Sequence, residues 1–299
     1  RVEPIDIEEY LEYLKVYKAD DNQVITNGEK GLARKFSSLR SFYRYFYRHQ
    51  MIEKNPTIFV DMPKLHDKAI IRLDIDEVAL LLDYVENCGK ELTGQKKVYY
   101  EKTKTRDLAI LTLLLGTGIR VSECVGLDIN DIDFKNNRIN VDHQLQRTRD
   151  MHYIIEDTKT ACGVRMIPMT PEVKECFERI IGNRPKPNVE PMIDGRSGFL
   201  FLDKNEMPMV ALHWEKYFQH VVEKYNRIYR AQLPKITPHV CRHTYCSNMA
   251  KAGMNPKTLQ YLMGHSDIGV TLNTYTHFKF EDAQAEVLLM DESCRKKSF

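Results

Sequence analysis

An arginine that follows a glycine-rich turn is the first residue of this sequence that could bind a phosphate. In Gly116-Thr-Gly-Ile-Arg120-Val-Ser-Glu123, the glycines let the backbone bend so that Arg120 projects from a helix start. Glu123 is near enough to orient the guanidinium, and an arginine can fork to two phosphate oxygens. Taken alone, an arginine after a glycine turn is usually an ordinary surface residue.

A lysine and a histidine–arginine pair follow further along the chain. Lys159 stands just before Cys162-Gly163, which we expect to be the turn of a hairpin, and its flexible stem could reach a ligand. In Thr237-Pro-His-Val-Cys-Arg-His243, the proline predicts a helix start, so His239 and Arg242 share one helix face. A histidine can move protons near neutral pH. A single exposed lysine in a hairpin is common and by itself indicates nothing.

A histidine and a tyrosine near the end of the chain complete the set of reactive side chains. Leu262-Met-Gly-His-Ser266 is followed by Asn273-Thr-Tyr-Thr-His277, so Tyr275 comes ten residues after His265. A tyrosine hydroxyl, with an ordinary pKa of about 10, is a weak nucleophile unless a base or a positive field assists it. A lone tyrosine near a terminus is usually structural.

Together, these motifs resemble the tyrosine recombinase family, also called the phage integrase family. The matching text is TGIRVSE, TKT with RMIP downstream, HVCRH, MGHS and NTYTH, and the resemblance to the catalytic part runs from about Leu73 to the end. The stretch GMNPKTLQYLMGHSDIGVTLNTYTH is similar to integrases of conjugative transposons from Gram-positive bacteria. Such integrases carry a further N-terminal arm-binding domain, and a chain that begins with Arg1 is expected to lack it.

The resemblance implies that the chain cuts and rejoins DNA as an enzyme. Tyr275 would attack the scissile phosphate, leaving a 3′-phosphotyrosine and a free 5′-hydroxyl. Arg120 and Arg242 would bind the non-bridging oxygens and stabilise the charge that grows in the transition state. Lys159 would protonate the departing 5′-oxygen.

The same resemblance gives supporting roles to three further residues. His239 would assist proton transfer at the tyrosine hydroxyl, His265 would hydrogen-bond the phosphate, and Glu123 would orient Arg120. Because the covalent bond conserves the energy of the broken linkage, no metal, ATP or other cofactor is expected.

The resemblance also implies the partners. These are double-stranded DNA at the ends of a mobile element and at its target or attachment sites, further copies of the chain in a tetramer that forms a Holliday junction, and an accessory directionality factor.

Two alternatives stay open, namely DNA relaxation by type IB topoisomerase chemistry and DNA binding by a regulator without catalysis. A zinc site is a third reading, because six ligand-capable residues gather late in the chain: His239, Cys241, His243, Cys246, His265 and His277. The stretch lacks the paired spacing of zinc ligands and the glutamate of an HExxH motif, which argues against this site.

Positive charge gathers in particular segments, although the formal net charge is only +2. Arg40, Arg44 and Arg48 recur every four residues and share one helix face, and we expect the aromatic residues interleaved between 42 and 47 to build the core opposite. Such a face can neutralise phosphates, but it can equally be a solvated helix surface. The residues predicted to bind DNA are Lys30, Arg34, Lys35, Arg40, Arg44, Arg48, Arg147 and Arg149.

The N-terminal elements that carry this basic face are expected to be helical. Apolar residues recur at helical spacing over 5–17 and 29–51, on either side of a polar turn at 20–28. Two proline breaks then predict a domain division: a helical core-binding domain at 1–63, a linker at 64–72 and a catalytic domain at 73–299.

The elements of the catalytic domain begin with two predicted helices. Asp74 and Glu77 form a capping box, and the apolar stretch from 104 to 115 predicts a buried helix that ends at the glycine turn 116–118. A basic cluster between Lys96 and Arg106 leads into this buried helix.

A small sheet and further helices follow. Short strands are expected at 138–141, 153–155 and 164–167. A helix should begin at Thr170-Pro171, and helices should fill most of 212–289. The fold class is therefore mainly α with a small antiparallel β-sheet (α+β), as a helical core-binding domain plus a tyrosine recombinase catalytic domain.

Length and composition set broad limits. A chain of 299 residues is long enough for two domains. Seven cysteines without a C-x-x-C pair fit free thiols in a reducing compartment. There is neither a signal peptide nor an apolar run long enough to span a membrane, so a cytoplasmic bacterial protein with no membrane partner is expected.

Overall fold

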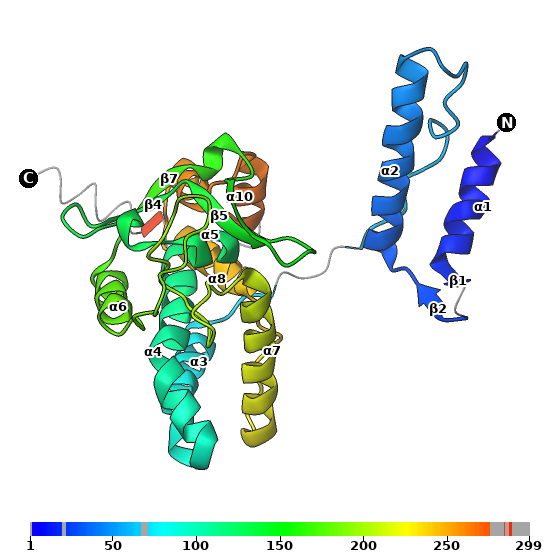
Figure 1. The fold of residues 1–299 in the computed structure, drawn as a ribbon. Coiled ribbons are helices and arrows are strands. Elements are labelled where there is room, and N and C mark those ends of the chain that lie inside the picture. Colours follow the sequence, from blue (N-terminus) through cyan, green and yellow to red (C-terminus); the bar gives the residue numbers. More distant parts are fainter. Residues whose placement is uncertain (1, 20–21, 67–70, 276–283, 285–286, 289–299) are drawn as a thin grey trace, which may run out of the picture. The chain divides into compact units, whose positions relative to one another are not determined.

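The computed structural model describes residues 2–19, 22–66, 71–275, 284 and 287–288, and the chain divides into two compact units, Arg1–Ala69 and Ile70–Phe299 (Figure 1). Each unit is described by itself. Within the described residues, no helix is both long and apolar enough to cross a lipid bilayer. The cysteines of the described residues are all free, as expected.

The N-terminal unit contains two helices, α1 (Pro4–Lys15) and α2 (Glu29–Arg48), as predicted. A short antiparallel hairpin joins them where a polar turn was predicted: β1 (Val16–Lys18) pairs with β2 (Val24–Thr26). Each strand has only three residues, too few to show an alternating pattern. Ile7 and Leu11 of α1 pack with Phe36 of α2 and with Val60 to form the core.

Tyr43 packs against this core, but the other aromatic residues between 42 and 47 do not, which corrects the expectation. Phe42, Tyr45 and Tyr47 are 54%, 57% and 46% exposed, and the buried residues of the helix come from its first half. Near-consecutive aromatic residues point around the whole circumference of a helix, whereas only one stripe of α2 faces α1. Phe42 and Phe46 instead contact one another, with ring centroids 4.7 Å apart.

The larger unit is mainly helical with small antiparallel sheets, so the predicted fold class is confirmed. Its helices are α3 (Ile75–Asn87), α4 (Gly94–Thr117), α5 (Val121–Gly126), α6 (Pro171–Gly182), α7 (Ala211–Ile228), α8 (Pro238–Lys251), α9 (Pro256–Met263) and α10 (Ile268–Tyr275). The predicted helical region beyond residue 275 lies almost entirely outside the described residues.

The predicted helix starts of this unit are confirmed by their caps. The Asp74 carboxylate accepts from the backbone N–H of Glu77 at 2.7 Å, and the Glu77 carboxylate accepts from that of Asp74 at 2.9 Å. Thr170 and Thr237 cap α6 and α8, and each is followed by a proline in the first turn. These local signals satisfy N–H groups that the helix cannot pair internally.

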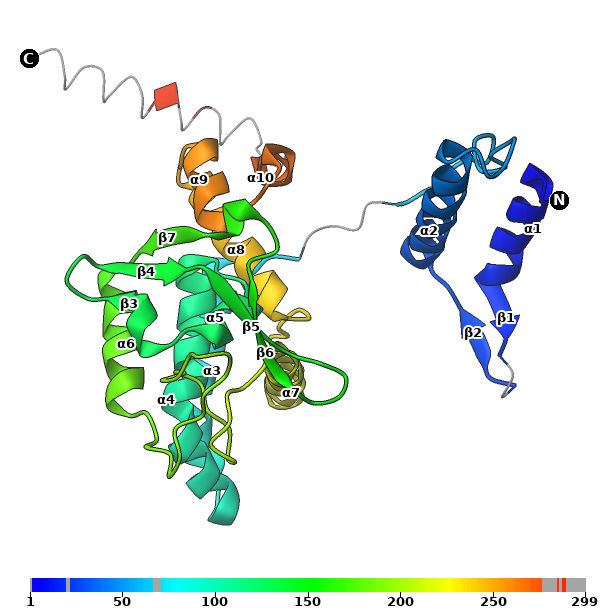
Figure 2. The ribbon, with the colours of Figure 1, turned by 45° about the horizontal axis from the view of Figure 1, so that its top comes forward.

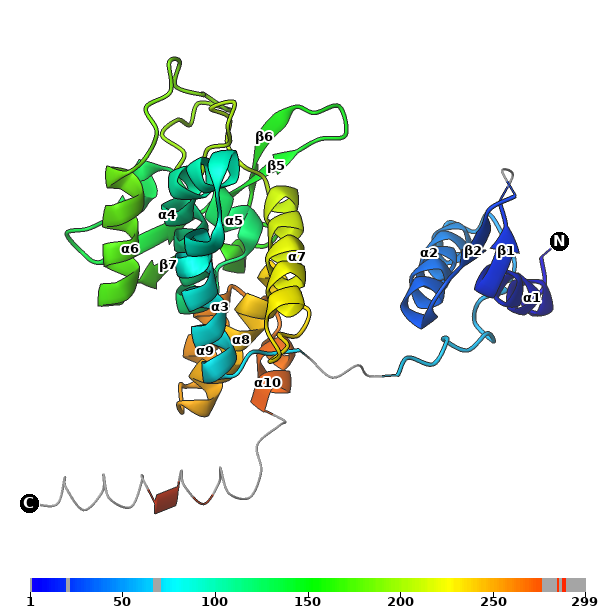
Figure 3. The ribbon, with the colours of Figure 1, turned by 90° about the horizontal axis from the view of Figure 1, so that it is seen from below.

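Helix α4 lies at the centre of the unit and is longer than predicted. It begins at Gly94, so the basic cluster between Lys96 and Arg106 lies on the helix rather than before it. The first half of α4 is largely exposed and shows no apolar stripe, although lysine, glutamine and glutamate favour helices. The second half packs against α3, α6 and α8 (Figures 1 and 3).

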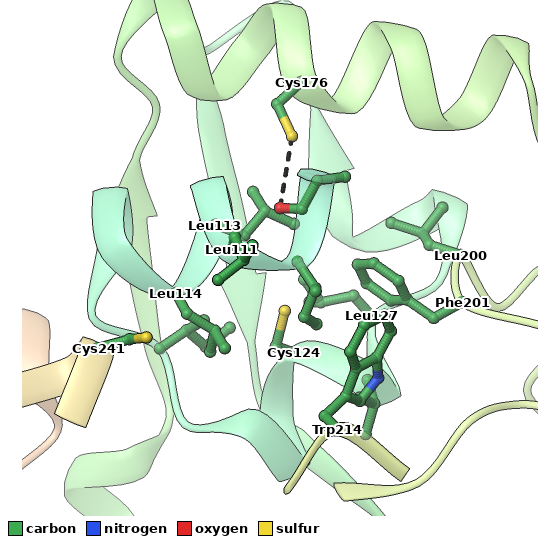
Figure 4. Packing of buried hydrophobic residues seen from close by; sticks show 14 of the residues in the cluster. Leu111, Leu113, Leu114, Cys124, Leu127, Cys176, Leu200, Phe201, Trp214 and Cys241 are labelled. Atoms are coloured by element: carbon green, nitrogen blue, oxygen red, sulfur yellow. Dashed lines mark hydrogen bonds between the residues drawn. The ribbon is translucent and has the colours of Figure 1, made fainter. Parts of the chain in front are cut away.

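The core around α4 draws on distant parts of the chain. Figure 4 shows Leu111 and Leu114 of α4 near Cys124 and Trp214, and Trp214 is fully buried. The Cys176 thiol of α6 donates to the carbonyl oxygen of Ala109 at 3.6 Å. Trp214 is the single tryptophan of the chain, so its fluorescence reports on this unit alone.

The strands of the larger unit form two small sheets, and this arrangement corrects the hairpin that was predicted around the turn at 162–163. One sheet has the order β3 (Ile132–Asp133), β4 (Arg138–Val141), β7 (Arg165–Pro168), and the other pairs β5 (His143–Arg147) with β6 (Tyr153–Asp157) (Figure 2). The turn at 162–163 therefore does not close a hairpin, because β6 and β7 belong to different sheets. The region around Gln144–Arg149 was expected to be a strand but without bounds or a partner, because the buried residues of β5 include His143 and Gln144, which sequence patterns treat as exposed.

Gly118 ends α4 in a conformation that suits glycine. Its φ is +63°, and its backbone N–H donates to the carbonyl oxygen of Leu114 at 3.3 Å. A Cβ atom at this position would lie 2.4 Å from Cδ1 of Tyr245 and 2.9 Å from Sδ of Met263. Both the backbone and the packing thus require glycine before Arg120.

We expect Gly118→Ala to lower the free energy of unfolding of the larger unit by about 2 kcal/mol or more, because strain and overpacking add. The measurement is urea unfolding followed by Trp214 fluorescence. Gly182→Ala is the matched control, since no atom lies within 4 Å of a Cβ built there and φ is not positive. Equal unfolding midpoints for the two variants would contradict this account of Gly118.

Candidate active site

A cleft of about 1230 Å³ in the larger unit brings together four of the six predicted catalytic residues. Arg120, Lys159, His239 and Arg242 all line it. They come from the start of α5, the connection after β6, and the first turns of α8. Residues far apart in the sequence are therefore collected around one space.

Arg120 is held in place by two acceptors. It precedes α5 directly, where its Nη1 donates to Oε1 of Glu123 at 2.7 Å and its Nη2 donates to the carbonyl oxygen of Gly264 at 2.9 Å. The Arg120 backbone N–H donates to Oε2 of Glu123 at 3.0 Å. The expected orienting contact between Glu123 and Arg120 is thus present.

Arg242 is buried in α8, with 4% of its surface exposed. Its guanidinium donates to the carbonyl oxygens of Gly118, at 2.6 Å, and Met263. Burial, and then the positive charge of Arg120, lower the pKa of Arg242. A guanidinium stays protonated at neutral pH in spite of such a shift, so Arg120 and Arg242 both bring positive charge to the cleft.

Glu123 balances part of this charge. Burial acts to raise the pKa of Glu123, but the hydrogen bonds and charges of Arg165 and Arg120 outweigh it and leave the pKa below its ordinary value. Oε2 of Glu123 accepts from Nη2 of Arg165 at 2.8 Å. The carboxylate is therefore ionised at neutral pH and is shared by two arginines.

The histidines are neutral at neutral pH. Burial, followed by the charges of Arg242 and Arg120, lowers the pKa of His265 to about 4 and also lowers the pKa of His239. Part of His239 is open to the cleft, while the surrounding protein removes water from the rest of its ring, which lies edge-on to His243 with centroids 4.4 Å apart. Nδ1 of His265 lies 3.0 Å from Oγ1 of Thr271, which belongs to α10.

Tyr275 is the last residue of α10, and its side chain lies outside the description. Helix α10 packs on α8 and α9, which carry or directly precede Arg242 and His265. Besides the contact of His265 with Thr271, Sγ of Cys246 lies 3.5 Å from Oγ1 of Thr274. The backbone that leads to Tyr275 is therefore attached to the same helices as the cleft.

The predicted DNA-binding residues lie on both units. On α2, Lys30, Arg34, Arg44 and Arg48 are exposed. Arg40 has a structural contact instead, since it donates to the carbonyl oxygen of Val60 at 3.3 Å and lies 5.0 Å from the centre of the Phe36 ring.

The remaining three predicted DNA-binding residues are Lys35, Arg147 and Arg149. Nζ of Lys35, on α2, lies 5.4 Å from the centre of the Tyr17 ring. In the larger unit, Arg147 of β5 lies over the ring of Tyr153 at 5.7 Å, and Arg149 is exposed in the turn before β6.

Two features of this site were not predicted from the sequence, namely Arg165 and one face of α7. Arg165 and Ile167 are the two inward-facing residues of β7. Because a charged residue rarely occupies an inward strand position, this arginine was the available signal of a buried polar contact. One face of α7 also lines the cleft, through Leu212, Glu215, Lys216, Gln219, Glu223 and Asn226. Their spacing of three and four residues indicates one helix stripe, but it does not indicate what that stripe faces.

A possible metal group lies away from the cleft. Among the described residues, the one group with metal-ligand spacing is Asp131, Asp142 and His143. Arg196 already donates to Asp131 at 3.3 Å and to Asp142 at 3.0 Å, so an arginine neutralises these carboxylates. His277 of the considered zinc set lies outside the described residues.

We expect the larger unit to lose stability as the pH falls from 7 to 5. An unfolded histidine, with a pKa of about 6.5, takes up a proton there that folded His265 does not, so this residue contributes at most about 1.4 kcal/mol per pH unit. His265→Gln should flatten the decline in urea midpoint measured by Trp214 fluorescence. His220→Gln, on an exposed position of α7, should leave the decline unchanged. An equal decline in wild type and His265→Gln would disprove the assignment.

Comparison with known proteins gives matches along most of the chain. The model of the phage integrase family matches residues 71–282. The transposase from transposon Tn916 of Enterococcus faecalis is 39% identical over 250 residues, which are 84% of this chain and 59% of the relative. The tyrosine recombinase XerC of Caldanaerobacter subterraneus is 31% identical over 282 residues, which are 92% of this chain and 66% of the relative. The chain thus spans about three fifths of the length of the transposon relative.

A solved structure is similar to this chain along nearly all of its length. The Tn1549 transposon integrase in complex with transposon right end DNA has a TM-score of 0.80 and 36% identity, covering 97% of this chain and 86% of that one. The predicted similarity to transposon integrases is therefore confirmed. Because the family model matches more than half of the sequence, this chain belongs to the phage integrase family of tyrosine recombinases.

Proposed function

We propose that this chain cleaves and rejoins DNA through a 3′-phosphotyrosine at Tyr275, in the integration and excision of a mobile element. The observation that carries the proposal is the convergence of Arg120, Lys159, His239 and Arg242 on one cleft. The Tn1549 integrase, a relative of similar fold, has been solved in complex with transposon right end DNA. This supports a DNA substrate with phosphodiester linkages.

In the proposed step, the Tyr275 oxygen bonds to phosphorus while the bond from phosphorus to the 5′-oxygen breaks. His239, neutral in the free protein, accepts the tyrosine proton, and Lys159 gives a proton to the departing 5′-oxygen. Rejoining is the reverse reaction with a new 5′-hydroxyl. The linkage energy is conserved in the phosphotyrosine, so the step needs no ATP.

The charges of the cleft suit this chemistry. Arg120 and Arg242 provide two cations for the non-bridging oxygens, whose negative charge grows in the transition state. Backbone carbonyls and Glu123 already hold both guanidinium groups, so little reorganisation is needed when DNA binds. His265, fixed by Thr271, completes the phosphate site as a hydrogen-bond donor.

The wider assembly is part of the same proposal. Residues 1–63 act as a core-binding domain, 64–72 as a linker and 73–299 as the catalytic domain. DNA is held by the basic residues of α2 and by Arg147 and Arg149. Strand exchange takes place in a tetramer of the chain, and an accessory factor sets the direction.

Tyr275→Phe should bind DNA as the wild type does but never become covalently attached, because only the attacking oxygen is lost. The test is a nicked suicide duplex made from the end junctions of the element, incubated in EDTA and run on a denaturing gel. Exchange between two junctions, compared with relaxation of a supercoiled plasmid, separates recombinase from topoisomerase activity. A slow band that persists in Tyr275→Phe, or loss of DNA binding in it, would refute the assignment.

Arg44→Gln combined with Arg48→Gln should weaken DNA binding and reduce its dependence on salt. If each arginine contacts one phosphate, the slope of log K against log salt concentration should fall by about 2. The measurement is a binding isotherm at several salt concentrations. Arg179→Gln, an exposed change on α6, is the control and should leave the slope as it is. An unchanged slope in the double variant would show that this face of α2 does not contact DNA.

A further inference from the structure

Arg165 is a fully buried cation that the proposed chemistry does not use. It lies on β7, and none of its side chain is exposed to solvent. Burying a charge is costly, and an apolar residue of similar size would fill the same space at lower cost. Its three hydrogen-bond partners indicate why an arginine is needed here.

Each partner belongs to a different segment of the site. Nη2 of Arg165 donates to Oε2 of Glu123 at 2.8 Å, and Glu123 holds Arg120. Nε donates to the carbonyl oxygen of Leu262 at 2.8 Å, three residues before His265. Nη1 donates to the carbonyl oxygen of Gly163 at 2.7 Å, four residues after Lys159.

The contact with Gly163 bears directly on the loop of Lys159. A Cβ atom on Gly163 would lie 2.4 Å from Cβ of Thr158, so the two ends of this loop touch. Oγ1 of Thr158 also donates to the carbonyl oxygen of Thr160 at 2.9 Å, which closes the loop around the exposed Lys159. Holding Gly163 therefore holds the base of the loop from which Lys159 projects.

The contact with α9 is equally close. A Cβ atom on Gly264 would lie 3.1 Å from Nη1 of Arg165 and 3.1 Å from the carbonyl oxygen of Cys162. The backbone N–H of Met166 donates to the hydroxyl of Tyr261 at 3.0 Å, a second link between β7 and α9. The loop of Lys159, strand β7 and the end of α9 thus meet at Arg165.

We propose that Arg165 is a positioning residue for DNA cleavage, which sets the Lys159 loop relative to Arg120 and His265. The inference rests on the proposed function, because it assumes that Lys159 protonates the leaving 5′-oxygen. Arg165 itself does not touch DNA, since its side chain is buried. A planar fork with three donating nitrogens reaches three acceptors that lie apart from one another, whereas an ammonium group donates all its hydrogen bonds from a single nitrogen.

The test compares wild type, Arg165→Lys and Ile167→Val on two suicide duplexes under single-turnover conditions. One duplex has the natural 5′-oxygen at the scissile position, and the other has sulfur there, because a thiolate leaves without needing a proton. Ile167→Val is the matched control, as Ile167 is buried two positions along the same strand. DNA affinity and the urea midpoint are measured for each protein, and Lys159→Ala serves as the reference for a lost acid.

We expect Arg165→Lys to bind DNA within about twofold of wild type but to cleave the oxygen duplex about 100-fold more slowly, as misplacement of a catalytic group by about 1 Å does. The ratio of sulfur to oxygen rates should rise at least about tenfold over wild type, in the direction of Lys159→Ala. Ile167→Val should show neither change. Wild-type cleavage of the oxygen duplex by Arg165→Lys, or a slower rate with an unchanged sulfur-to-oxygen ratio, would overturn the inference.

A second variant keeps the test decisive if Arg165→Lys does not fold. Arg165→Met with Glu123→Gln removes the Arg165 cation together with the carboxylate that pairs with it, and its sulfur-to-oxygen ratio should exceed that of Glu123→Gln alone. An equal ratio in the two proteins would overturn the inference. If wild type forms no covalent adduct on either duplex, the proposed function itself fails. If wild type forms the adduct and the Arg165 variants form it equally well, only the inference about Arg165 fails.

Discussion

Three consecutive carbonyl oxygens at the end of α9 each accept a hydrogen bond from a different arginine. Leu262 accepts from Arg165, Met263 from Arg242 and Gly264 from Arg120. The C-terminus of a helix carries partial negative charge and unpaired carbonyl groups, so it is a favourable place for cations. The meeting of β7, α8 and the start of α5 at this helix end is what forms the site.

This arrangement addresses the main electrostatic difficulty of the cleft. A phosphate site needs several cations close together, and they repel one another before the anion arrives. The carboxylate of Glu123 lies between Arg120 and Arg165, and the α9 carbonyls take up further donors. Burial, and then the same positive surroundings, lower the pKa of His265, so its ring is uncharged at neutral pH.

The sequence predicts those parts of the structure that depend on local signals. The capping box at Asp74, the proline after Thr237 and the glycine turn at Gly118 all act within a few residues, and each element begins or ends where they indicate. The grouping of four predicted catalytic side chains around one cleft followed from the resemblance rather than from spacing, because it depends on contacts between distant segments. Their chemical roles remain proposals.

The incorrect predictions concern features that depend on contacts between distant segments rather than on local signals. The sheet partner of β6, the burial of β5 and the exposure of Phe42 and Tyr45 depend on what packs against each segment, and a periodic pattern does not contain that information. Arg165 was missed for a related reason. A single charged residue in an apolar strand looks like an exposed position until its three acceptors are seen.

The use of main-chain acceptors also shapes how the site can evolve. Substitutions at Leu262 or Met263 change the packing of α9 but cannot delete the oxygens that hold the arginines, since every residue type has the same carbonyl. A change of side chain in this turn therefore does not by itself remove an acceptor of the three arginines. The vulnerable point is Gly264, whose left-handed conformation, with a φ of +60°, ends the helix and aims those oxygens.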